Sequence, residues 1–254
     1  MNGDEEEGTG LPASFEMAWG VRERPNKGPK RGLSLEQIVD AGVAVASTDG
    51  LGAVSMSRVA GELGTSAMSL YRYVASKDEL LALMVDAALG DIPDPPLDEP
   101  WRAGLEWWAR VELAAYRAHP WALRVPVSSA PITPNTLLFL DRGLQCLGGT
   151  NLAEGEKMSV VLLLTSFTRS WAMLSADIVA AVADGTSVHV NFNYGAILSK
   201  LITPDGFPAL TKVLAAGVFE NPEESTDIEF LEHDFNFGLA TLLDGVEVLV
   251  RARE

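Results

Sequence analysis

Cysteine and histidine are scarce in this 254-residue sequence. The single cysteine, Cys146, excludes an intramolecular disulfide framework, and its place in an expected helix favours inert burial over a redox role. The three histidines, His119, His189 and His233, stand in no metal-ligand spacing. We therefore expect neither a disulfide scaffold nor a metal site.

The sequence also lacks the motifs of common enzymes and of membrane or exported proteins. It has no Gly-rich phosphate loop and no Gly-x-Ser-x-Gly nucleophile elbow. It has no run of 18 apolar residues to indicate a transmembrane helix, and its acidic start, Met1–Glu7, has the wrong charge for a secretory signal. These absences predict a cytoplasmic protein that is not an enzyme, needs no cofactor and has no membrane partner.

Basic residues are few as well: 19 Lys and Arg face 35 Asp and Glu, for a net charge of −16. This balance argues against a general nucleic-acid binder. The charge is uneven, however, because residues 19–77 hold eight basic and five acidic side chains, whereas residues 91–254 hold 11 basic and 22 acidic ones. Salt screening over ~8 Å keeps these regions electrostatically separate, so a mildly basic segment on an acidic body is expected to favour specific contacts.

Residues 33–89 predict four short helices with one tight turn at Gly64–Ser66. Ser34 and Gln37 fit a capping box at the start of the first helix, and Gly64 can take a positive φ in the turn. Two short helices joined by a glycine-containing turn form a helix-turn-helix, whose second helix can enter the DNA major groove.

Further serines mark where the other helices begin. Ser55 and Ser66 are expected to cap the second and third helices. Ser76–Glu79 fits a second capping box, which opens a fourth amphipathic helix.

The run from Thr65 to Leu81 carries a more specific pattern. Its Leu-Tyr-x-Tyr-Val-x-x-Lys-Asp-Glu-Leu stretch resembles the DNA-binding signature of the tetracycline-repressor (TetR) family. The segments Phe207–Leu210 and Phe235–Val246 are similar to the C-terminal domain of the tetracycline-repressor-like branch. An ordinary three-helix packing unit is the alternative for the first segment.

The resemblance implies an all-α protein with an N-terminal DNA-binding domain and a C-terminal domain for ligand binding and dimerisation. The turn and third helix are expected nearest the bases, and the family comparison assigns phosphate contacts to Tyr71, Tyr73 and Lys77. Tyr73 stands where histidine is frequent in the family pattern. The full expected DNA-binding set is Arg58, Thr65, Ser66, Ala67, Met68, Ser69, Tyr71, Arg72, Tyr73 and Lys77.

Composition suggests the boundaries of the other segments. Residues 1–32, rich in Gly, Pro and charge, are typical of a flexible tail, whose basic residues could form a DNA-contacting arm or simply be solvated. The helix-turn-helix domain occupies 33–90, and a Pro-rich linker, 91–100, precedes a helical body at 101–254. Helices are predicted in the body at residues 101–118, 134–147, 154–183, 192–201, 208–216 and 227–251.

The terminal helix, 227–251, is apolar on nearly every side, which predicts burial on all sides. Gly238 and Gly245 are seven residues apart and share one face, where backbones can approach closely. We expect this helix to pack on its own core and on a partner subunit. In the family it resembles, the long helix and the terminal helix form a four-helix bundle across a two-fold axis.

The body is larger than DNA binding requires, which suggests a sensor for a small molecule. Aromatic residues that could line a pocket are Trp107, Trp108, Trp121, Phe139, Phe167 and Trp171. Candidate polar anchors are Asn135, Thr165, Thr168, Arg169 and Ser175. Because the body holds few basic groups, we expect an apolar, aromatic or cationic ligand; the alternative is that the aromatic stripe is plain core.

Together these patterns predict a homodimeric repressor that binds a palindromic operator in double-stranded DNA and is released by a small ligand. The alternative is a DNA-binding regulator without ligand control, which acts as an architectural or partner-recruiting factor.

Overall fold

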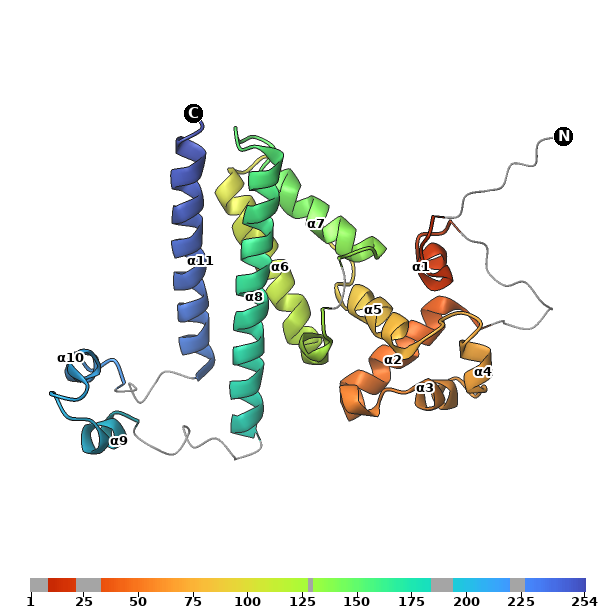
Figure 1. Ribbon diagram of the computed structural model, residues 1–254, viewed down its shortest axis with the longest axis horizontal. Helices are drawn as coiled ribbons and strands as arrows, with labels where there is room; N and C mark the ends of the chain where they lie inside the picture. The colour runs from red at the N-terminus through yellow and green to blue at the C-terminus, as the bar shows by residue number, and fades with distance from the viewer. Residues whose placement is uncertain (1–8, 22–32, 128–129, 184–193, 220–226) are drawn as a thin grey trace. The chain divides into compact units, whose positions relative to one another are not determined.

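The computed structural model describes residues 9–21, 33–127, 130–183, 194–219 and 227–254. Its regular elements are all helices, and no strand occurs among these residues (Figure 1). The all-α class predicted from the sequence is confirmed. The chain divides into two compact units: residues up to Ala172 together with Val246–Glu254, and residues Met173–Gly245.

The first unit contains the predicted helix-turn-helix within a group of short helices that we call the N-terminal head. The head comprises α2 (Leu35–Asp49), the 3-10 turn η1 (Leu51–Ala53), α3 (Met56–Glu62), α4 (Ala67–Leu70) and α5 (Lys77–Ala88). Its helices share one hydrophobic core, in which Ile38, Val59, Leu70, Leu80 and Met84 are fully buried. Each such side chain contributes about 1.5–3 kcal/mol, so burial of this core fixes how α3 and α4 are held.

Side-chain caps fix the starts of α2 and α3. The Ser34 hydroxyl accepts from the Gln37 backbone N–H at 3.1 Å, and the Gln37 side chain accepts from the Ser34 N–H at 3.0 Å, so the predicted capping box is confirmed. Ser55 likewise accepts from the N–H of Arg58 at 3.1 Å. Ser66 makes no cap bond, because its hydroxyl lies 3.1 Å from that of Ser69 instead.

A short N-terminal helix, α1 (Ala13–Ala18), corrects the prediction of a tail over this part of residues 1–32. Phe15 is buried in the head core, and the Ser14 hydroxyl donates to the Glu79 carboxylate at 2.7 Å. Glu79 also accepts from the N–H of Ala75, so its carboxylate does not complete the predicted second capping box. The basic cluster at residues 22–31 lies outside the described residues.

The first unit continues through α6 (Trp101–Ala118), the 3-10 turn η2 (Pro120–Arg124), α7 (Pro134–Cys146) and the first part of α8 (Glu154–Ala183). α6 and α7 pack closely because Gly143 leaves room for the Trp108 ring. That ring stacks on Phe139 with centroids 4.6 Å apart. The end of α11 (Asp227–Arg251) belongs to this unit, with Glu247 3.3 Å from Arg102 and Arg253 2.5 Å from Glu156.

The second unit contains the end of α8, α9 (Tyr194–Leu201), α10 (Pro208–Ala215) and α11 as far as Gly245. α9 and α10 pack against each other, and Pro208 stands at the first turn of α10, where its missing N–H costs nothing. The helices predicted in this region are confirmed; residues 192–193 lie outside the described residues. By length and composition, residues 154–181 of α8 could cross a membrane, but core helices pass the same test.

Candidate nucleic-acid interface and effector site

The turn between α3 and α4 has the geometry expected of a helix-turn-helix. Gly64 adopts φ +62°, the left-handed conformation that a side chain would oppose. The Thr65 N–H donates to the Ala60 carbonyl at 2.9 Å, which closes the turn onto α3. Leu70 and Val74 are fully buried beneath α4, so its opposite side faces outward.

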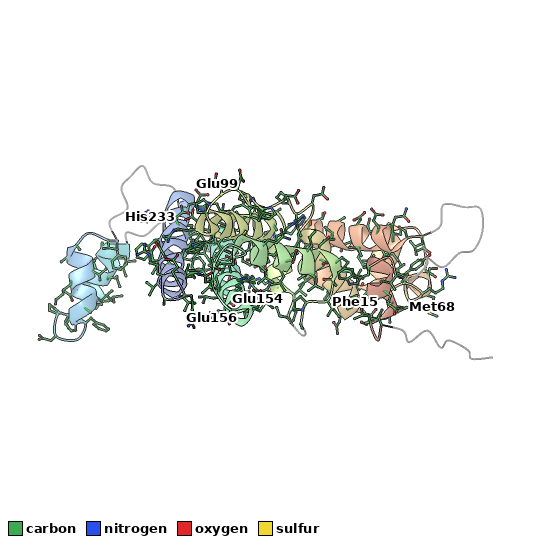
Figure 2. The ribbon with its side chains drawn as sticks, turned by 90° about the horizontal axis from the view of Figure 1, so that it is seen from above. Phe15, Met68, Glu99, Glu154, Glu156 and His233 are labelled. Atoms are coloured by element: carbon green, nitrogen blue, oxygen red, sulfur yellow. The ribbon has the colours of Figure 1, made fainter. Side chains whose placement is uncertain are left out.

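Most of the expected DNA-binding residues lie on α4 or directly beside it and are exposed or half-buried there. Met68 is 75% exposed and Tyr71 is 47% exposed, and Figure 2 shows Met68 at the outer end of the head. Ser66, Arg72 and Lys77 are also exposed. Thr65, Ala67 and Ser69 are half-buried at the edges of the same surface.

Two residues of the expected set have other partners. Tyr73 is buried in the head core, and its hydroxyl donates to the Leu33 carbonyl at 2.6 Å, so it is a packing residue rather than a phosphate ligand. Arg58 is exposed, but its guanidinium pairs with Asp49 at 2.9 Å and also with Glu62. These two carboxylates raise the pKa of Arg58 and offset its attraction for a phosphate.

Lys77 stands at the first position of α5, where free backbone N–H groups favour an anion. Ser76 caps this helix by accepting from the Glu79 N–H at 3.1 Å. The Lys77 side chain is exposed, so its ammonium is open to solvent at this helix start.

Three of the aromatic residues expected to line a ligand pocket are buried and packed against neighbouring side chains. Trp108 is fully buried, stacks on Phe139 and donates its indole N–H to the Phe139 carbonyl at 2.8 Å. Trp121 packs into the head core and donates to the Ser47 hydroxyl at 3.1 Å. With their polar atoms satisfied, these side chains contribute to the stability of the first unit.

The other three aromatics are only partly buried. Trp107, Phe167 and Trp171 have intermediate exposure, and the Trp171 indole N–H is buried without a hydrogen-bond partner. Trp171 is therefore the strongest of the aromatic candidates. A buried donor without a partner is costly, and a ligand acceptor would relieve that cost.

The expected polar anchors differ in what they bind. Asn135, on α7, donates to the Asp86 carbonyl and lines a depression of about 300 Å³ beside α1 and α2. Its side chain therefore faces the N-terminal head rather than the interior of the body. Arg169 donates to the carbonyls of Leu123 and Val125 at 2.9 and 3.0 Å. Thr168 is fully buried and its hydroxyl has no partner, whereas Thr165 and Ser175 are half-buried.

Sequence reasoning missed Glu112, which is 3% exposed on the inner face of α6. Burial raises the pKa of its carboxyl to about 8, against a smaller lowering by its hydrogen bond with Tyr116 and by the charge of Arg169. The signal was available, because Glu112 follows Leu105 by seven residues and Trp108 by four, on the same helical stripe. A search for apolar residues alone passes over it.

Among the described residues, no group of three or more His, Cys, Asp or Glu could hold a metal ion. Burial raises the pKa of the Cys146 thiol to about 11, and the thiol donates to the Arg142 carbonyl. This cysteine is buried and stays protonated, so it lacks the thiolate that a reactive site needs.

Comparison with known protein families matches almost the whole chain. Residues 38–84 match bacterial regulatory proteins of the tetR family, and residues 92–250 match the tetracyclin repressor-like C-terminal domain. Over 248 residues the chain is 36% identical to the HTH-type transcriptional repressor DrrR1 of Streptomyces coeruleorubidus, covering 96% of this chain and 88% of that protein.

Solved structures agree with this match. A possible TetR family transcriptional regulator from Streptomyces coelicolor A3(2) is 27% identical, with a TM-score of 0.60 over 84% of this chain and 98% of that one. ActR from Streptomyces coelicolor in complex with actinorhodin is 24% identical, with a TM-score of 0.67 over 87% of this chain and 98% of that one. The likeness to ActR shows a shared fold.

Proposed function

Because this chain belongs to the tetracycline-repressor family of bacterial transcriptional regulators, we propose that it represses transcription as a homodimer on a palindromic operator and that a small ligand releases it. The family consists of regulators, not enzymes. The observation that carries the proposal is the exposed side of α4, held over a buried core next to the anion-favouring start of α5. The related DrrR1 is itself a transcriptional repressor.

On DNA, α4 enters the major groove and presents Met68 to the bases, with Thr65, Ser66, Ala67 and Ser69 at the bases or flanking phosphates. Tyr71, Arg72 and Lys77 bind phosphates on either side. Tyr73 is left out because its hydroxyl is bonded to Leu33, and Arg58 contributes little because Asp49 and Glu62 pair with it.

Dimerisation uses α8 and α11, each of which carries exposed apolar side chains. On α8, Met158, Leu162, Leu163 and Leu174 are exposed. On α11, Phe237 and Val248 are each 70% exposed, so the burial predicted for every side of the terminal helix is not met within one protomer. A Cβ atom at Gly245, between these two residues, would meet no heavy atom within 4 Å. Such apolar side chains on long helices are typical of a surface that a partner covers.

The ligand is a small apolar, aromatic or cationic molecule, and it acts from the cytoplasm, where the DNA is. ActR, which shares the fold, has been crystallised with actinorhodin, which supports a small-molecule effector here. A ligand shifts the DNA-binding equilibrium only by its different affinities for the bound and released states.

The decisive experiment is operator selection with the purified protein, followed by a screen for compounds that release the selected DNA. Recovery of an inverted repeat, with half-sites one helical turn or a multiple apart, would support a dimeric reader. A protein that recovers no palindrome would contradict the operator proposal. An operator complex that resists every compound class would favour the alternative, a DNA-binding regulator without ligand control.

A further inference from the structure

Glu112 is a buried carboxyl that the fold leaves incompletely bonded. It lies on α6 at 3% exposure, and its Oε2 atom has no hydrogen-bond partner among the described residues. A buried carboxyl oxygen without a donor is expensive, because it has lost the water that would bond it and gained nothing in return. The structure offers no packing reason for this cost.

The cation nearest to this carboxyl is already engaged. Arg169 interacts with Glu112 electrostatically, but its guanidinium bonds the Tyr116 hydroxyl at 3.3 Å and the carbonyls of Leu123 and Val125. Tyr116, one turn along α6 from Glu112, supplies the carboxyl's one side-chain hydrogen bond. The other carboxyl oxygen, Oε2, is therefore available to accept a hydrogen bond from a bound ligand.

Two further unbonded polar atoms lie within one turn of Arg169 on α8. The Thr168 hydroxyl is fully buried without a partner, and the Trp171 indole N–H is also buried without one. Arg169 links this turn of α8 to Tyr116 and Glu112 on α6. Thr168 and Trp171 are three residues apart and share one side of α8, whereas the unbonded oxygen of Glu112 is on α6 of the same unit.

We propose that Glu112 is the polar anchor of the effector site and that the effector is an aromatic molecule carrying a protonated amino group. This inference rests on the ligand-released function proposed above. The ammonium donates to Oε2 of Glu112. A charged donor is favoured over a neutral hydroxyl, because hydrogen bonds to ionised groups are roughly twice as strong. The acidic body also attracts a cation.

The pH dependence of binding follows from the groups that face the carboxyl, which are Tyr116 on α6 and Arg169 on α8. Glu112 is mostly neutral below its pKa of about 8, and it must lose its proton to pair with an ammonium. Binding of a cation should therefore strengthen as the pH rises toward 8, with the proton released to solvent.

The test uses three probes that share one ring: 2-naphthylmethylamine, 2-naphthylmethanol and 2-naphthoate. Calorimetric titration of the full-length protein at pH 6 and pH 8 measures the affinity of each. We expect the amine to bind the wild-type protein at pH 8 at least about tenfold tighter than the alcohol, with the carboxylate weakest. The amine should gain affinity from pH 6 to pH 8, and the alcohol should not.

Glu112→Gln should abolish both the amine preference and its pH dependence, so that the amine and the alcohol bind this variant with similar affinity at pH 6 and at pH 8. This variant should fold, because glutamine resembles the neutral carboxyl in size and shape. Glu106→Gln, on the same helix but partly exposed and paired with Arg102 at 3.6 Å, is the matched control and should behave as wild type.

An amine that binds the wild-type protein no tighter than the alcohol, or does not bind at all, would overturn the assignment. So would an amine preference that survives Glu112→Gln. Either result leaves the proposed function standing if the wild-type protein still binds a palindromic operator that some other compound releases. Failure of the operator selection itself would contradict the proposed function instead.

Discussion

Lys77 combines three properties that mark a phosphate-binding side chain. It is exposed, it stands at the start of α5, and it lies seven residues after Leu70, the last residue of α4. In the proposed DNA complex, the backbone N–H groups at this helix start and the ammonium would act on the same phosphate. Because a phosphate contact carries no base information, its loss should weaken binding to all sequences alike.

Lys77→Ala should lower affinity for specific and non-specific DNA by a similar factor and reduce the slope of log affinity against log salt by about one per protomer. Titration of labelled operator at several salt concentrations measures both quantities. Lys212→Ala, which removes an exposed lysine from α10, should leave them unchanged. An unchanged salt slope for Lys77→Ala would refute the contact.

The buried carboxyl of Glu112 also makes the stability of the protein depend on pH. Its pKa is about 8 in the folded protein, against an ordinary value of 4.5, so the folded state retains the proton more strongly than the unfolded state does. With respect to this group the wild-type protein is therefore most stable below about pH 4.5, and it loses that contribution as the pH rises through 8.

Glu112→Gln should therefore remove the loss of stability that the wild-type protein shows as the pH rises. Compared with wild type, its free energy of unfolding should be similar near pH 5 and higher near pH 8, as measured by urea denaturation at both values. Glu106→Gln should run parallel to wild type. If the difference between Glu112→Gln and wild type does not grow with pH, the carboxyl is not neutral in the folded protein.

For single residues, the sequence predicts which side chains are candidates for a binding site better than it predicts what each of them does there. The exposed residues around α4 can be identified because a helix-turn-helix pattern fixes which side of a short helix packs inward. The pocket predicted from six aromatic residues stays a prediction: Trp108, Phe139 and Trp121 are buried, but helical spacing places a side chain on a buried face without showing whether that face meets core or ligand. The role of Tyr73 depends on the position of the Leu33 carbonyl, which no local pattern contains.

Individual helices follow sequence signals closely where those signals are local. α2 and α3 begin at the predicted serine caps, and α7 begins at Pro134, which suits the first turn. α1 is missed because Phe15 is buried through contacts with the head, a long-range effect that composition does not reveal. The second half of the expected capping box at Ser76 fails for the same reason, because Glu79 bonds Ser14 instead.

The contact between α6 and α7 depends on a glycine. A Cβ atom at Gly143 would lie 2.7 Å from the Trp108 ring, and that ring is held by its stacking on Phe139 and its hydrogen bond to the Phe139 carbonyl. These contacts hold the ring in place. A side chain at position 143 would therefore force the ring or α7 to shift.

Gly143→Ala should lower the free energy of unfolding by about 1–3 kcal/mol, as overpacking of a core does. Urea denaturation followed by circular dichroism measures the change. Gly61→Ala, in α3 with open space around the new Cβ, should be neutral or up to about 1 kcal/mol stabilising because alanine favours helices. Equal stability of Gly143→Ala and wild type would mean that α7 shifts to accommodate the methyl group.

The whole protein combines a charge of −16 with a DNA-binding role, so its affinity must come from well-placed contacts in the head rather than from bulk attraction. A single head covers one half-site, and two heads are needed for a palindrome. Dimerisation can be tested by substitutions on α8 and α11, whose exposed apolar faces form the proposed interface. Gly245 is suited to that test, because a Cβ atom there would meet nothing within 4 Å outside its own helix turn among the residues that the structure describes.

Gly245→Arg should fold normally yet sediment as a monomer, because a charged side chain buried between helices without a partner is strongly unfavourable. Its operator affinity should fall by orders of magnitude while non-specific binding per head persists. Gly149→Arg, which also points into open space but lies after α7, should remain dimeric. Sedimentation of Gly245→Arg as an intact dimer would exclude α11 from the interface at this point.

The two ends of α5 are attached to different parts of the first unit, which gives this helix a mechanical role in the proposed ligand control. Lys77 stands at one end, and near the other end the Asp86 carboxylate accepts from the Thr136 N–H at 2.8 Å and its hydroxyl at 3.0 Å, which joins α5 to α7. The two residues are separated by roughly 13 Å along a stiff rod at 1.5 Å per residue, so a tilt of about 5° about one end moves the other by about 1 Å. A displacement of that size carries a hydrogen bond at its best length beyond useful range. As a lever, α5 can thus convert a small rotation at α7 into loss of a phosphate contact.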